Sequence, residues 1–80
     1  MRGIGWQVDD YLSALGVLII NVRTHRLGES VDIAQELVVP LKDRYIEVLI
    51  YFREPGAELA AERVQWTPAM GYVAIDISTD

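Results

Sequence analysis

Residues 46–53 read Ile46-Glu-Val-Leu-Ile-Tyr-Phe-Arg53 and carry the clearest strand signal in the chain. Apolar side chains stand at every second position from Ile46 to Phe52, as expected when one face of a strand packs on a core. Residues 17–23, Val17-Leu-Ile-Ile-Asn-Val-Arg23, form an almost continuous apolar stretch that predicts an interior strand. The connection between the two stretches is long enough for a right-handed parallel crossover through a helix.

The connecting segment, residues 30–45, has helical periodicity. Its apolar stripe comprises Val31, Ala34, Leu37, Val38, Leu41 and Tyr45. Ser30 is a suitable N-cap, and acidic residues near it favour the start of a helix. Pro40 removes a backbone donor, so we expect a kink or a break there. A strand over residues 37–41 remains the alternative.

The remaining elements are predicted from shorter patterns. Val8, Tyr11, Leu12 and Leu15 have helical spacing, which predicts a helix over residues 6–15 that Gly16 ends. Residues 57–63 are rich in Ala and Glu and predict a second short helix, and strands follow at 64–67 and 72–78 around a loop at 68–71. The expected fold is α+β in two layers, in the order α-β-α-β-α-β-β, with helices on one face of a small mixed sheet of about four strands.

Length and composition exclude several classes of protein. Eighty residues with 51% hydrophobic side chains predict a single soluble domain over residues 1–80. The absence of cysteine excludes disulfide scaffolds, zinc ribbons and thiol catalysis. The formal net charge of −5 argues against a nucleic-acid partner. No apolar run is long enough to cross a membrane and no targeting signal is visible, so we expect a cytoplasmic protein.

The sequence offers little for catalysis. We expect no catalytic residue, no metal site and no cofactor, because the acidic residues stand where helix N-termini usually carry them and no serine has a recognisable base nearby. One weak anion site is conceivable where basic residues precede the helix at 30–45. It would use Arg23, His25, Arg26 and Ser30. Glu29 and Asp32 oppose it, because they would repel a phosphate.

The two faces of the predicted sheet differ in composition. One face is almost wholly apolar and needs the helices to cover it; it carries Leu18, Ile20, Val22, Ile46, Val48, Ile50, Phe52, Val64, Trp66, Val73, Ile75 and Ile77. The opposite face carries Asn21, Arg23, Glu47, Gln65, Thr67, Ala74 and Asp76 around an apolar patch. The predicted interface or ligand-binding residues there are Val17, Ile19, Leu49, Tyr51, Arg53 and Tyr72. An apolar centre with a charged rim is typical of a protein interface.

These observations lead to two hypotheses of different kinds. The first is a non-enzymatic interaction module that associates with itself, most simply as a two-fold dimer, and can present a groove to another protein or a small ligand. The second is a small-molecule or anion-binding domain, or an enzyme, whose site forms at a subunit interface around Arg23, His25, Tyr51, Arg53 and Tyr72. The apolar patch favours the first hypothesis, because no cluster of titratable residues supports the second.

Overall fold

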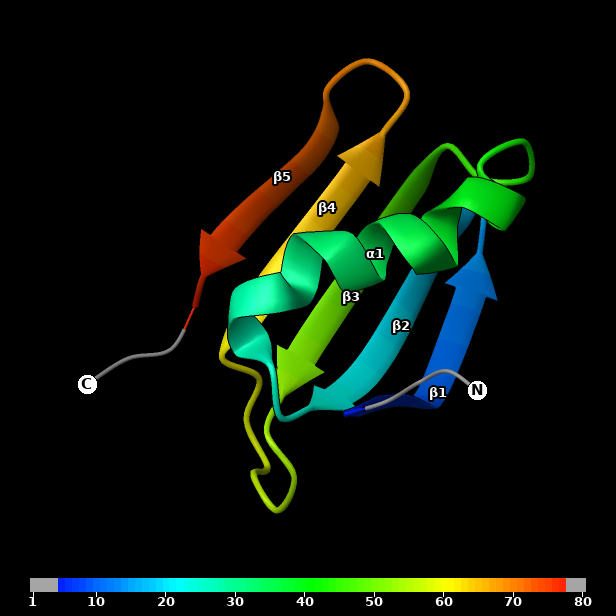
Figure 1. Ribbon diagram of the computed structural model, residues 1–80. Helices are drawn as coiled ribbons and strands as arrows, with labels where there is room; N and C mark the ends of the chain where they lie inside the picture. The colour runs from blue at the N-terminus through cyan, green and yellow to red at the C-terminus, as the bar shows by residue number, and fades with distance from the viewer. Residues whose placement is uncertain (1–4, 78–80) are drawn as a thin grey trace.

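The computed structural model describes residues 5–77, which form one five-stranded sheet with α1 packed on one side of it (Figure 1). The strands are β1 (Trp6–Ala14), β2 (Val17–Thr24), β3 (Glu47–Arg53), β4 (Glu62–Thr67) and β5 (Gly71–Asp76). Helix α1 (Ser30–Val38) lies between two 3-10 turns, η1 (Leu27–Glu29) and η2 (Val39–Leu41). Strands neighbour one another in chain order, and only β2 and β3 run parallel.

The core lies between α1 and the helix-facing side of the sheet. Its buried side chains are Leu18, Ile20, Val22, Ile33, Ala34, Val38, Val48, Ile50, Phe52, Val64 and Trp66. The interior strands predicted at 17–23 and 46–53 are therefore confirmed, with the expected apolar residues of β2 and β3 turned toward the helix. Ile46 is an exception to that prediction, because it precedes β3 and is exposed.

The predicted fold class is wrong in the number and order of its elements. The chain follows the order β-β-α-β-β-β, with five strands and one α-helix among residues 5–77, in place of about four strands and three helices. Residues 6–15 form strand β1 and not a helix. The predicted helix at 57–63 is a loop followed by the first residues of β4.

A β-bulge explains why residues 6–15 look helical in sequence. The pairing of β1 with β2 shifts between Val8 and Asp10, so Val8 lies opposite Val22 and Tyr11 lies opposite Ile20. The extra residue brings Val8 and Tyr11 onto the same side of the strand. Their spacing of three residues imitates one helical turn, although the backbone is extended.

Gly16 ends no helix; it belongs to the tight turn between β1 and β2. Ala14 pairs with Val17, and the two residues between them have positive φ angles, 57° at Leu15 and 81° at Gly16. Two-residue turns of this kind match the twist of the flanking strands but strain any residue with a Cβ. A Cβ on Gly16 would also lie 3.2 Å from Cγ1 of Ile46.

We expect Gly16→Ala to lower the free energy of unfolding by about 1–2 kcal/mol, because alanine disfavours this backbone conformation. Gly28→Ala is the matched control: a Cβ there meets no atom within 4 Å of the described structure. The control should change stability by less than about 0.5 kcal/mol. Urea unfolding of both variants measures the difference, and equal stabilities would contradict the strained turn.

Helix α1 ends where the proline was expected to end it. Val38 is its last residue, and Pro40 lies in η2. The alternative strand at 37–41 is wrong. Ser30 is not the N-cap, because Glu29 takes that position and Ser30 is a buried first helical residue. None of the helices within residues 5–77 is long and apolar enough to span a membrane.

Two arginines hold the segment that was expected to form the helix at 57–63. The Arg23 guanidinium donates hydrogen bonds to the carbonyl oxygens of Glu54 and Ala57, at 3.2 and 2.9 Å. Arg53 donates to the carbonyl oxygen of Glu58 at 2.6 Å. These bonds give the carbonyl oxygens of the loop hydrogen-bond donors outside a helix. A helix over so few residues would be too short to be stable alone, and the contacts with the two arginines hold the segment in an irregular path instead.

The turn between β4 and β5 reverses the predicted faces of β5. Thr67 pairs with Gly71, which leaves a three-residue loop and places Tyr72 opposite Trp66 on the helix-facing side. A shift of one residue exchanges the two faces of a strand. Val73 and Ile75, predicted for the core, therefore lie on the side of the sheet away from α1, whereas Tyr72, Ala74 and Asp76 do not.

Candidate functional site: the open face of the sheet

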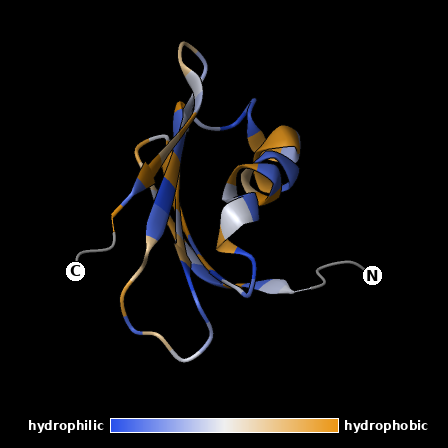
Figure 2. Ribbon diagram, turned by 60° about the vertical axis from the view of Figure 1, so that its left-hand side comes forward, coloured by the Kyte–Doolittle hydropathy of each residue, from blue (hydrophilic) through white to orange (hydrophobic). Residues whose placement is uncertain are grey.

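The side of the sheet away from α1 is covered by no other helix or strand of residues 5–77, and we call it the open face (Figure 2). Strand pairing assigns its side chains, because residues paired across a sheet point to the same side. Its apolar members are Leu12, Ala14, Val17, Ile19, Leu49, Tyr51, Val73 and Ile75.

Four of these apolar side chains lie in one row that crosses the whole sheet. Leu12 pairs with Ile19, Ile19 pairs with Leu49, and Gln65 connects Leu49 to Val73. We call Leu12, Ile19, Leu49 and Val73 the apolar row. Leu12 is 66% exposed, and the other three remain partly exposed. The row is therefore an apolar strip, interrupted on β4 by Gln65, that residues 5–77 leave in contact with water.

The polar residues beside the row bind one another. The Nε of Arg23 lies 2.6 Å from the Asp9 carboxylate, and the Asn21 amide donates to Asp10 at 2.7 Å. Arg53 donates to the Asn21 side-chain oxygen at 2.8 Å. These bonds join β1, β2 and β3 and satisfy their charged groups within one chain, whereas Arg63 of β4, at the same end of the open face, has no hydrogen-bond partner within residues 5–77 for its buried Nε.

The opposite end of the open face has its own polar pair. The Gln65 amide donates a hydrogen bond to the Glu47 carboxylate. Gln65 is the one polar residue aligned with the apolar row, and this bond turns its amide toward β3. The row therefore has hydrogen-bonded polar groups on both sides.

Most of the predicted interface residues lie together on the open face. Val17, Ile19, Leu49 and Tyr51 form adjacent positions on β2 and β3, with Arg53 at one end. Leu12, Val73 and Ile75 also lie on this face but were not predicted there, because the sequence pattern indicated a helix for Leu12 and the core for Val73 and Ile75. The bulge at Asp9–Asp10 and the three-residue loop before Gly71 place these residues on the open face, and the local sequence indicated neither feature.

Tyr72 is the predicted interface residue that lies elsewhere. It packs against the core on the helix-facing side, next to Trp66. Burial raises the pKa of the Tyr72 hydroxyl above its ordinary value, because desolvation disfavours the phenolate. The shift follows from packing, and Tyr72 cannot join Tyr51 and Arg53 in a single site.

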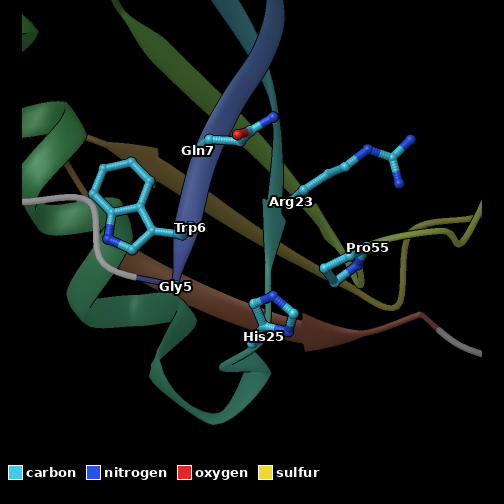
Figure 3. A pocket seen from close by; sticks show the side chains of 6 residues that line it. All are labelled: Gly5, Trp6, Gln7, Arg23, His25 and Pro55. Carbon is cyan, nitrogen blue, oxygen red and sulfur yellow. The ribbon is translucent and has the colours of Figure 1, made fainter.

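The candidate anion site is only partly assembled. Arg23 and His25 line a surface pocket of about 350 Å³ together with Gly5, Trp6, Gln7 and Pro55. Figure 3 shows the Arg23 side chain extending away from His25, on the other side of β1 from the Trp6 ring. Arg26 lies outside this pocket and pairs with Glu29 at 3.4 Å, and Ser30 is buried. The four predicted residues therefore do not converge.

We expect sulfate to leave the His25 ring signals unmoved in an NMR titration at tens of millimolar, roughly the range of weak anion sites. Asp9 already compensates Arg23, and Glu29 compensates Arg26. A net charge of −5 further opposes anion binding. A saturable shift of His25 with sulfate, absent with chloride at equal ionic strength, would contradict this expectation.

Residues 5–77 contain no group of three or more His, Cys, Asp or Glu side chains that could hold a metal ion. Comparison with family models, with curated proteins and with solved structures finds no significant match to this chain.

Proposed function

We propose that this protein is a non-enzymatic interaction module that forms a homodimer through the open face of its sheet. The observation that carries the proposal is the apolar row, which has members on four of the five strands on the side that α1 leaves uncovered. A contiguous exposed apolar surface with a polar rim is characteristic of protein interfaces. A cytoplasmic location belongs to the same proposal and rests on the sequence alone.

The small size of the domain supports a covered second face. A chain of this length buries only about 60–65% of the surface that its unfolded form exposes, which leaves a small margin of stability. The sheet has α1 on one side, so half of its area contributes nothing to a core within the monomer. Packing a second copy on the open face would place the apolar row between two layers.

The charge distribution favours a second copy over an unrelated partner. A protein with a net charge of −5 repels another copy of itself unless the contacting surfaces are locally neutral. The ion pair of Arg23 with Asp9 and the bonds of Asn21 to Asp10 and Arg53 make this end of the open face compensated within each chain. Arg63, which lies between Tyr51 and Ile75 on the same face, has no such partner within residues 5–77, so a second copy would have to supply an acceptor for it or leave it at the rim.

The alternative, a ligand-binding domain or enzyme with its site at the interface, has weaker support. Its five proposed residues fall on different surfaces: Tyr51 and Arg53 on the open face, Tyr72 on the helix-facing side, and His25 at the end of the sheet. Arg23 uses its guanidinium to hold Asp9 and the loop after β3.

Light scattering behind gel filtration tests the proposal. We expect a mass near twice the 9.0 kDa of the chain at a loaded concentration of about 50 µM, with dissociation on dilution below the dissociation constant. A mass of 9.0 kDa at every concentration up to solubility would overturn self-association.

A further inference from the structure

A cavity of about 370 Å³ opens on the helix side of the sheet, near the edge formed by β1. Helix α1 packs against β3, β4 and β5, and the helix-facing residues of β1 remain accessible. Val8 is 40% exposed and Tyr11 is 71% exposed, although both point to the helix side. The cavity therefore exists because the helical layer is narrower than the five-stranded sheet.

The floor and one wall of the cavity are fixed parts of the fold. Leu18 and Ile20, both buried core residues of β2, form its floor. Leu41 and Tyr45, from the turn after α1, form the wall opposite β1 and pack against the core. The backbone N–H of Arg44 donates to the carbonyl of Leu41 at 2.9 Å, which holds this turn in place.

Arg44 is the only charged residue among the described residues that line the cavity. Its side chain is exposed and forms no hydrogen bond or ion pair within residues 5–77. A guanidinium group binds a carboxylate with two parallel hydrogen bonds, which gives such a pair both strength and orientation. The cavity thus combines a broad apolar surface with one unused cationic group.

We propose that this cavity binds a small amphipathic carboxylate, a compact alkyl or aryl group that carries one carboxylate. The apolar group would lie above Leu18 and Ile20 and contact mainly the exposed side chains of Val8 and Tyr11, and the carboxylate would bind Arg44. The cavity volume is within the range of about 300–1,000 Å³ that is usual for small-molecule sites. This site lies on the opposite side of the sheet from the proposed dimer interface and does not depend on it.

The lining distinguishes this class of ligand from others. A cationic amphiphile would place its charge beside Arg44 and be repelled. An inorganic anion would leave the apolar floor in water and gain nothing from it. A neutral apolar molecule would bury surface but leave the guanidinium unused. A ligand with both an apolar group and an anionic group can contact the apolar and aromatic lining and also bind the Arg44 guanidinium.

An NMR titration with octanoate tests the proposal, with octylammonium as a probe of equal chain length and opposite charge. We expect saturable shifts of the Tyr11, Leu18, Arg44 and Tyr45 backbone amides with octanoate, and at least tenfold weaker binding of octylammonium. Equal affinity for the two probes would overturn the assigned ligand class. Shifts centred on Leu49 and Tyr51 would place the bound octanoate on the open face and overturn the site.

Two matched variants separate a direct contact from general charge. Arg44→Gln should weaken octanoate binding about tenfold or more, the usual loss when a charged hydrogen-bonding partner is removed. Lys42 lies two residues before Arg44, and its side chain does not line the cavity. Lys42→Gln therefore removes the same charge without removing a lining group, and should leave the affinity within twofold. Equal losses in both variants would overturn the role of Arg44. If dilution of the protein alone shifts the same amides, a second copy fills the cavity and the proposal is wrong.

Discussion

Replacement of Leu49 by arginine is expected to convert the proposed dimer into a folded monomer. Leu49 lies at the centre of the apolar row, between Ile19 and Gln65. A guanidinium at the dry centre of an interface costs about 2–4 kcal/mol of binding, which raises the dissociation constant about 30-fold or more. The monomer should tolerate the change, because Leu49 is partly exposed there and arginine can extend its charged end into water.

The control for this variant introduces the same charge on the other side of the molecule. Val39 is exposed in η2, on the helical layer, and Val39→Arg should leave the dimer intact. Ile75→Arg, on the open face of β5, should weaken the dimer in the same direction as Leu49→Arg. Light scattering reports the mass of each variant, and circular dichroism reports its folding. If Leu49→Arg and Ile75→Arg stay dimeric and folded, the interface does not involve the open face.

Replacement of Phe52 by alanine is expected to produce the largest loss of stability of any single truncation. Phe52 has no exposed surface and is the largest fully buried side chain of the described structure. It lies opposite Val22 of β2 and belongs to the same core cluster as Ile33, Ala34 and Val38 of α1. Removing a buried phenyl ring costs about 3–5 kcal/mol, because apolar burial is lost and a cavity remains. In a domain of this size, that loss lowers the melting temperature by more than about 12 °C.

Leu59→Ala is the comparison for Phe52→Ala, because Leu59 is 83% exposed in the loop after β3. It should change the free energy of unfolding by less than about 0.5 kcal/mol. Both variants need to be compared at one protein concentration, since association stabilises the folded chain by mass action. A loss below 1 kcal/mol for Phe52→Ala would contradict the packing of the core described here.

The strongest predictions from sequence concerned segments in which local pattern and burial agree. Strands β2 and β3 have apolar residues at every second position on the side that meets α1, and the structure confirms both strands and their faces. The same alternation places the predicted interface residues of β2 and β3 on the opposite side of these strands; they are Val17, Ile19, Leu49, Tyr51 and Arg53. The position of Pro40 likewise predicted the end of α1, because proline removes a helical hydrogen bond wherever it occurs.

The elements that were predicted wrongly depend on contacts between distant residues. At the bulge in β1, Asp9 and Asp10 bind Arg23 and Asn21 of β2, and the bulge gives an extended segment the spacing of a helix. The path of residues 54–61 depends on the guanidinium groups of Arg23 and Arg53. Neither interaction is visible in the local sequence of the segment that it shapes.

The sequence by itself therefore determined the two central strands, the end of the helix and the apolar character of both faces of β2 and β3. Those properties follow from side-chain alternation and from the chemistry of single residues. Tertiary structure alone decided the identity of β1 and the faces of β5. A bulge, or a loop shorter by one residue, moves every later side chain of a strand to the opposite face of the sheet. Pairing with the neighbouring strand fixes this register, and local propensity does not.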